Sequence, residues 1–352
     1  MLDQPHVVAQ HDPANMLGVV AQLPEQASTD ITVESTTHQS SPAIEAVVLA
    51  GMGGSALAAD VIAALLGNQL AIPLVVSKGY DIPAFVNKTT LVITISHSGN
   101  TEETLSCYQQ AQERQAQLVV LSSGGTLLEW TARDGVPHVR IPTGWQPRMA
   151  TIFHLRALAK LLHHCGVIDG QLYQQIGDNA DWLAQQVAAW APDVPTADNY
   201  AKQLAMLTVG KIPVFLAGEI TWPLAYKWKI SWNESAKNIA FCNRYPEFSH
   251  NEFIGWSSHP VEKPFAVIDL RSQLERPRIR QRMELSDKLL SGKRPKAHPV
   301  ELVGKTLVQQ MLWGLALADA ASIYTAILNG VNPEPVALVE RLKHELAQID
   351  QQ

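Results

Sequence analysis

The chain has 352 residues with a formal net charge of −6 at pH 7, and 46% of its residues are hydrophobic. This length is enough for two packed domains, and the apolar content is enough to give each a full core. The negative charge argues against a nucleic-acid partner and gives no general attraction for anions, so any anion site must be built locally.

Three cysteines, Cys107, Cys165 and Cys242, are widely spaced and include no CxxC pair. We expect buried thiols in a reducing compartment, hence a cytoplasmic protein, rather than disulfides or metal ligands. Residues 1–21 show no basic segment followed by an apolar core, so no signal peptide is predicted. The apolar stretch 47–66 contains glycines and an aspartate, and we do not expect it to span a membrane.

The first half of the chain predicts alternating strands and helices. A short helix from 12 to about 23 and a polar linker at 28–41 come first. Strands are then expected at 46–50, 74–77, 91–95, 118–122 and 138–141, and helices at 56–66, 102–115 and 127–131. Strands that alternate with helices imply a parallel sheet covered on both faces, an α/β fold.

The second half predicts a similar α/β unit after a helical connection. Helices are expected at 149–164, 171–191, from 199, and at 222–233, 307–328 and 336–349, and strands at 212–217, 265–269 and 298–302. We therefore divide the chain into an N-terminal helix and linker (1–40), a first domain (41–165), a connecting helix (166–198) and a second domain with a C-terminal helix (199–352).

A glycine-rich turn, residues 51–56, follows the first predicted strand and opens a helix. It fits G-x-G-x-x-A, but a dinucleotide site also needs an acidic residue at the end of the next strand, where this chain has Lys78. A tight turn without a ligand is a second alternative. We favour a turn in which Gly53 and Gly54 let a small ligand approach the backbone and Ser55 contributes a hydroxyl.

A second turn, Ser96 to Thr101, places three hydroxyls and a glycine between a strand and a helix. The free N–H groups and the dipole at a helix start favour an anion such as phosphate. Asn100 or Thr101 could instead cap the helix, but capping explains one hydroxyl and not three. Glu102 and Glu103 follow directly and would compete with a phosphate unless they point away from it.

Three further residues could carry chemistry. Arg148 follows a loop and precedes a helix, where a guanidinium can bind an oxyanion. Glu234 ends a helix, and His250 follows it by sixteen residues. Together with a phosphate loop, these side chains suggest general acid–base catalysis on a phosphorylated metabolite. No metal is expected, because the chain has no HxH, no HExxH and no cysteine cluster.

Five segments resemble the sugar isomerase (SIS) fold and, more closely, the bifunctional phosphoglucose/phosphomannose isomerases. In chain order they are GMGGSALAAD, SHSGNTEET, PRMA, NESAKN and SHNE. The resemblance covers nearly the whole chain. It implies two SIS domains, each a flavodoxin-like three-layer αβα unit, and a homodimer without metal or organic cofactor. The implied reaction of central carbohydrate metabolism interconverts glucose 6-phosphate or mannose 6-phosphate with fructose 6-phosphate through a cis-enediol.

The resemblance also implies a role for each candidate residue. Gly53, Gly54, Ser55, Ser96, Ser98 and Thr101 correspond to the phosphate-binding residues. Glu234 corresponds to the base that moves a proton between C1 and C2, and Arg148 to the cation facing the enediolate. His250 corresponds to the ring-opening histidine, contributed by the neighbouring subunit, and Lys343 to a lysine that assists ring opening.

Two other functions are weighed against this one. A non-catalytic sugar-phosphate sensor would not need both Glu234 and His250, and residues 1–40 show no basic helix-turn-helix module. An amide-transferring enzyme would need an N-terminal cysteine, where this chain has Met1-Leu2-Asp3. Many relatives carry an aromatic residue at the position of His97, which could add positive charge near the phosphate below pH about 6.5.

Overall fold

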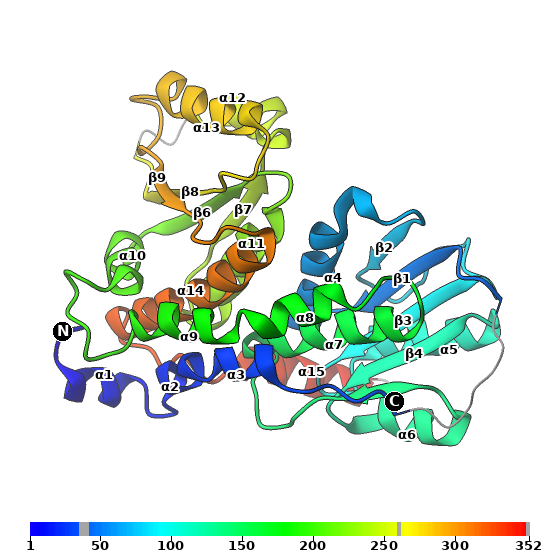
Figure 1. Ribbon diagram of the computed structural model, residues 1–352. Helices are drawn as coiled ribbons and strands as arrows, with labels where there is room; N and C mark the ends of the chain where they lie inside the picture. The colour runs from blue at the N-terminus through cyan, green and yellow to red at the C-terminus, as the bar shows by residue number, and fades with distance from the viewer. Residues whose placement is uncertain (35–41, 259–261, 350–352) are drawn as a thin grey trace.

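The computed structural model describes residues 1–34, 42–258 and 262–349, so positions 35–41 of the predicted linker lie outside the described residues. Figure 1 shows two lobes, each built on its own sheet, with helices α7, α8 and α9 running in succession beneath both. Both sheets are entirely parallel, as the alternating pattern predicts.

The first sheet has the strand order β2-β1-β3-β4-β5. Its strands are β1 (Ala46–Gly51), β2 (Leu74–Ser77), β3 (Thr90–Ser96), β4 (Gln117–Ser122) and β5 (His138–Arg140). Side chains alternate between two cores along β1: Val47 and Leu49 face α4 (Gly53–Leu66) and α7 (Thr151–His164), whereas Val48 and Ala50 face α5 (Glu102–Glu113) and α6 (Gly125–Asp134). Both faces are therefore apolar, which makes a three-layer unit.

The second sheet has the order β7-β6-β8-β9 and repeats this arrangement with one strand fewer. Its strands are β6 (Ile212–Ala217), β7 (Phe241–Arg244), β8 (Phe265–Arg271) and β9 (His298–Glu301). One face packs on α10 (Tyr200–Thr208), α11 (Trp222–Glu234) and α14 (Leu307–Leu328). The other face packs on η3 (Glu247–His250), α12 (Glu252–Gly255) and α13 (Pro277–Leu289).

One continuous core joins the two sheets. Helix α4 of the first lobe packs on α11 and α14 of the second, and α7 packs on α4. Helix α14 is long and apolar enough to cross a membrane, but 94% of its apolar window is buried inside the fold, so we assign it to this shared core. The positions of α11 and η2 (Pro147–Met149) relative to each other are thus fixed by packing.

Several predicted elements need correction. The expected helix at 171–191 is two helices, α8 (Gln171–Asp178) and α9 (Ala180–Ala188), because the Asn179 side chain donates to the Gln175 carbonyl at the break. Such short polar side chains compete with helical backbone bonds. The expected helix from 12 to about 23 is the shorter α2 (Met16–Ala21), and a further helix, α3 (Leu23–Ser28), follows beyond the expected range.

Among the described residues, four further α-helices and strands were not predicted. They are α1 (Pro5–His11), β7, α12 and α13. Strand β7 is a four-residue edge strand and α13 is rich in charge, so neither has the apolar run that marks a core element. The domain boundaries stay a prediction.

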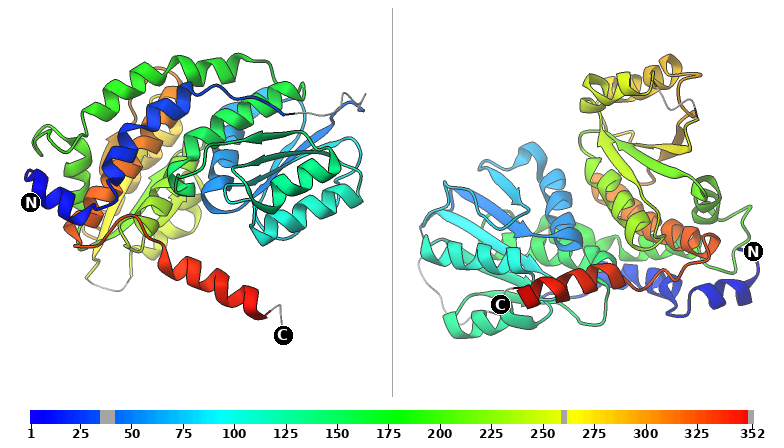
Figure 2. Two further views of the ribbon diagram at one scale, coloured as in Figure 1. Left: turned by 90° about the horizontal axis from the view of Figure 1, so that it is seen from below. Right: turned by 180° about the vertical axis from the view of Figure 1, so that it is seen from behind.

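The C-terminal helix α15 (Ala337–Ile349) stands away from the body of the molecule (Figure 2). Its apolar side chains are exposed, Leu338 at 83%, Leu342 at 60% and Ile349 at 66%. The amphipathic pattern that predicts this helix therefore has no partner surface within the described chain.

A buried ion pair lies where α11 meets α14. Lys227 Nζ donates to Asp319 Oδ1 over 2.6 Å and to the Arg148 carbonyl over 2.8 Å, and Ser231 Oγ donates to the same carboxylate oxygen over 3.0 Å. Burial raises the pKa of Asp319, whereas Lys227 and Ser231 lower it. The pair ties the shared core to η2.

We expect Asp319→Ala to lower the free energy of unfolding by about 3–5 kcal/mol, because it leaves the Lys227 ammonium buried without its counter-ion. Urea titration measures the effect. The matched control is Glu284→Ala, which breaks the exposed Arg280–Glu284 pair on α13 and should leave the midpoint unchanged. Equal effects of the two substitutions would show that Asp319 does not stabilise the core.

Candidate active site

The two predicted ligand turns lie side by side at the carboxyl ends of β1 and β3. The chain leaves β1 towards β2 on one side and returns to β3 on the other, so the strand order reverses between them. Ligands of open α/β sheets bind at this kind of crevice. The fold therefore places both turns where a small ligand is expected.

The glycine turn brings a second segment into contact with its backbone. Gly53 has φ +51° and starts α4. A Cβ on Gly54 would lie 2.9 Å from the Pro147 carbonyl oxygen and 3.1 Å from the Arg148 nitrogen. Gly54 is thus required so that η2, which carries Arg148, can pack against the turn.

The hydroxyl turn is organised by its own side chains. Ser96 Oγ lies 2.8 Å from Thr101 Oγ1 and accepts the Gly99 N–H over 3.1 Å, while Ser98 Oγ accepts the Asn100 N–H over 3.3 Å. Thr101 precedes α5 but makes no side-chain capping bond, and Asn100 Oδ1 accepts from Thr126 instead. The capping alternative is therefore wrong for both residues.

The two turns are joined through Ser55 and His97. Ser55 Oγ accepts the His97 backbone N–H over 3.1 Å, so the hydroxyl of the first turn is held at the start of the second. Glu102, one of the two carboxylates expected to compete with a phosphate, accepts a hydrogen bond from Tyr80 Oη over 3.1 Å.

The His97 ring points inward rather than toward the turn. It packs edge-to-face on His154 of α7, with ring centroids 5.4 Å apart. Burial lowers the pKa of His97 and lowers that of His154 to about 3. The expectation that His97 gains positive charge just below pH 6.5 is therefore wrong, because desolvation disfavours the charged ring.

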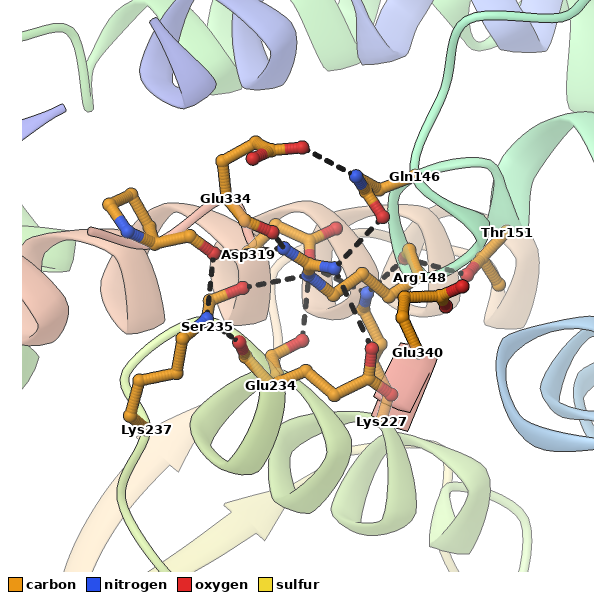
Figure 3. Close-up of polar contacts among 12 residues, drawn as sticks. Gln146, Arg148, Thr151, Lys227, Glu234, Ser235, Lys237, Asp319, Glu334 and Glu340 are labelled. Atoms are coloured by element: carbon orange, nitrogen blue, oxygen red, sulfur yellow. Dashed lines mark hydrogen bonds and ion pairs between the residues drawn. The ribbon is translucent and has the colours of Figure 1, made fainter. Parts of the chain in front are cut away.

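Arg148 lies at the centre of the polar contacts that join the lobes (Figure 3). Its side chain is 1% exposed. Nε donates to Ser235 Oγ over 3.1 Å, and Nη2 donates to the carbonyl oxygens of Pro333 over 2.8 Å and Glu334 over 2.7 Å. These bonds fix the plane of the guanidinium.

The remaining donor of that guanidinium faces Glu234. Arg148 Nη1 lies 3.6 Å from Glu234 Oε2, and its bond to Gln146 Oε1 is long at 3.4 Å. The Glu234 side chain is 34% exposed, so the carboxylate lies at the surface of the site, beside a cation that is buried. A base beside a fixed cation suits the transfer of a proton next to a developing oxyanion.

The structure thus connects most of the predicted site residues by direct contacts. In the hydroxyl turn, Thr101 contacts Ser96, and the backbone of the next residue, His97, donates to Ser55 of the glycine turn. Gly54 of the glycine turn packs on η2, where Arg148 faces Glu234. Ser98 is exposed at the edge of the same turn. The contacts between these residues are observed, whereas their roles remain predictions.

Two predicted residues, His250 and Lys343, do not join this group. His250 is exposed at the end of η3, on the face of the second sheet that packs on α13. Lys343 is exposed on α15, where its ammonium pairs with Glu340 over 3.1 Å. Within one chain, neither residue has a described contact with Arg148 or Glu234.

The second lobe fills its equivalent crevice with a side chain. Glu275 follows β8 as the hydroxyl turn follows β3, and its Oε1 accepts the N–H of Ile220 over 3.0 Å and of Thr221 over 3.3 Å, at the start of α11. A Cβ on Gly218 would lie 2.1 Å from this oxygen. The equivalent position of the second lobe is thus occupied by the Glu275 carboxyl group, whose pKa is raised by burial and lowered by the bonds from Ile220 and Thr221.

Sequence reasoning missed several members of the site. Ser235 and Lys237 lie inside the NESAKN segment, and their closeness to Glu234 was the available signal. Gln146 and Glu334 had no such signal, because the bond from Gln146 Nε2 to Glu334 Oε1, 2.6 Å long, joins residues 188 positions apart. Among the described residues, no group of three His, Cys, Asp or Glu side chains is placed to hold a metal ion.

Comparison with solved structures identifies the class of fold. The C-terminal domain of glucosamine-fructose-6-phosphate aminotransferase from Francisella tularensis superposes with a TM-score of 0.68 at 12% identity, covering 91% of this chain and 98% of that one. A SIS domain model matches residues 44–126, and a model described as the bacterial phospho-glucose isomerase C-terminal SIS domain matches residues 197–346. The protein is therefore built from two SIS domains, as the sequence predicts.

Sequence comparison gives the family. A bifunctional phosphoglucose/phosphomannose isomerase of Caldicellulosiruptor bescii is 31% identical over 95% of this chain and 99% of its own length. A protein of the same name from Aquifex aeolicus is 31% identical over 85% of this chain and 90% of its own. The chain belongs to the bifunctional phosphoglucose/phosphomannose isomerase family and is an isomerase.

We expect the buried His154 to make the fold acid-sensitive. Its folded pKa, about 3, lies below the unfolded value near 6.5, so the unfolded state binds the additional proton and stability falls as pH falls through this window. Between pH 6 and 4, the free energy of unfolding of the wild type should fall by up to about 1.4 kcal/mol per pH unit more than that of His154→Leu. Denaturant unfolding across this range measures the difference.

The exposed His164 on the same helix provides the control, and His164→Leu should keep the acid dependence of the wild type. Parallel curves for wild type and His154→Leu would contradict the assignment.

Proposed function

We propose that the protein interconverts glucose 6-phosphate and mannose 6-phosphate with fructose 6-phosphate through a cis-enediol intermediate. The observation that carries this proposal is the Glu234 carboxylate held 3.6 Å from the buried Arg148 guanidinium. The Arg148 segment packs on the glycine turn, which is hydrogen-bonded to the turn of three hydroxyls. Aldose–ketose isomerisation requires a base, a stabiliser of negative charge and an anchor for the phosphate.

The phosphate is assigned to the crevice between β1 and β3. Ser55, Ser96, Ser98 and Thr101 supply hydroxyls there, and the start of α4 adds backbone N–H groups and the positive end of a helix dipole. Because this anchor is remote from C1 and C2, its binding energy positions the reacting carbons without taking part in the chemistry.

Proton transfer is assigned to Glu234. Its carboxylate removes the proton from C2 of the aldose and returns it to C1, while the hydroxyl proton of O2 passes to O1, which gives the ketose. The reverse reaction runs through the same enediolate. Arg148 Nη1, the donor that faces Glu234, stabilises the negative charge on the sugar oxygens, whereas Nε and Nη2 hold the guanidinium in place. The proposed steps use side chains alone, with no metal or organic cofactor.

Ring opening is assigned to His250 and Lys343, and this part of the proposal requires a second copy of the chain. Both residues are exposed and have no described contact with Arg148. Helix α15 stands away from the body of the molecule (Figure 2), and its apolar side chains are exposed. A homodimer in which each copy gives His250 to the other site would complete the constellation. The three free thiols support a cytoplasmic location. The proposed substrates assign the protein to glycolysis and gluconeogenesis.

Glu234→Gln tests the assigned base. We expect turnover of fructose 6-phosphate to fall by at least about 10²-fold, because the amide cannot accept the proton. Formation of glucose 6-phosphate and of mannose 6-phosphate is followed by separate coupled assays, and competitive inhibition by inorganic phosphate reports whether the anchor is intact.

Glu284→Gln on α13 is the matched control and should retain wild-type activity. Absence of turnover of either aldose phosphate by the wild-type protein would refute the proposed function, whereas full activity of Glu234→Gln would refute only the assigned base.

Mixing two inactive variants tests the shared site. Glu234→Gln and His250→Gln homodimers should each be inactive, but subunit exchange creates heterodimers with one site that holds both native residues. A 1:1 mixture should recover about a quarter of the wild-type activity if dimers form at random. The control is to cross-link each variant before mixing, which should abolish recovery.

Activity that stays at the level of the separate variants, despite exchange detected by mass spectrometry, would place His250 and Glu234 of one chain in the same site.

A further inference from the structure

Lys237 has an unusual backbone conformation beside the proposed base. It lies three residues after Glu234, just beyond α11, with φ +51°, a left-handed value that it shares with only Asn15 and Gln115 among the described non-glycine residues. Side chains with a Cβ rarely adopt this region, and residues that do so gather at functional sites. Neither the sequence motifs nor the proposed steps assign a role to this lysine.

The left-handed backbone turns the Lys237 side chain back over the end of α11 (Figure 3). Its Nζ donates to the Glu234 backbone carbonyl and, over 3.2 Å, to the Pro333 carbonyl. The Pro333 oxygen also accepts from Arg148 Nη2 over 2.8 Å. One carbonyl of the segment that leads to α15 is therefore shared by the lysine next to the base and by the active-site arginine.

The charges around Lys237 are mixed. Burial and the nearby Arg148 lower its pKa to about 8, whereas Glu234 and Glu334 act in the opposite direction. These groups come from each segment packed around the ammonium, namely η2, α11 and the stretch before α15. Although the residue as a whole is exposed, its ammonium therefore has a pKa below that of a free lysine.

We propose that Lys237 is a positioning residue that clamps the Pro333–Glu334 segment between the end of α11 and Arg148, and so keeps Glu234 and the guanidinium at their working separation. The inference rests on the proposed function. A simple helix cap would need only the bond to the Glu234 carbonyl. The second bond, to an acceptor that also fixes Arg148, couples the lysine to the geometry of the site.

Lys237→Met and Lys237→Arg test the clamp, with Lys305→Met as control for loss of an exposed lysine. We expect Lys237→Met to lower kcat at least tenfold while inhibition by inorganic phosphate stays unchanged, because the phosphate anchor is separate. The wild-type kcat should decline above pH 8. Lys237→Arg should retain most of the activity and extend it to higher pH, since a guanidinium stays charged.

Hydrogen–deuterium exchange of residues 331–336 gives a readout that needs no turnover. Exchange should be faster in Lys237→Met than in Lys305→Met or Lys237→Arg. Unchanged exchange, a kcat within twofold of wild type, or the same alkaline decline in Lys237→Arg would each overturn the clamp. If the wild-type protein turned over no hexose 6-phosphate, the proposed function would fail and exchange alone would decide the clamp.

Discussion

The site depends on the burial of one guanidinium. The Arg148 side chain is buried at the junction of the two lobes. The acceptors beside its three nitrogens come from the end of α11, from Gln146 and from the stretch before α15. Burying this charge is costly unless hydrogen bonds replace its hydration. The α11 terminus and the stretch before α15 are therefore held near η2, which brings a carboxylate of the second lobe to the glycine turn of the first.

Packing around the guanidinium makes this arrangement rigid. Gly54 allows η2 to lie directly on the turn, and Lys227 binds the Arg148 carbonyl from below while paired with Asp319 of α14. The helix that presents Glu234 is thus anchored at both the polar site and the shared apolar core. Side chains supported in this way hold their geometry without relying on flexible loops.

The sequence predicted the parts of the molecule in which local signals agree. Alternating apolar strands gave both parallel sheets, and the glycine and hydroxyl turns fell at the ends of the expected strands. Elements without an apolar run, β7 and α13 above all, gave no signal. The contacts of Gln146, Pro333 and Glu334 with the site could not be predicted, because each depends on segments brought together only by the tertiary fold.

The ring-opening roles of His250 and Lys343 came from family resemblance alone, and neither residue has a described contact with Glu234 within one chain. Residue types and spacing carry no information on which copy of a chain supplies a side chain. The exposure of the apolar face of α15 could not be predicted either. A helical pattern predicts an apolar stripe but does not tell which surface covers it.

Because of Glu275, the two SIS domains differ in what binds the N–H groups at the equivalent helix start. The second domain carries this carboxyl group as part of the chain, at an effective concentration that no dissolved phosphate can match. The hydroxyl turn of the first domain presents hydroxyls in place of that carboxyl group, so an anion bound there would come from solution. Because one continuous core joins the two lobes, such binding would stabilise the whole fold and not one lobe alone.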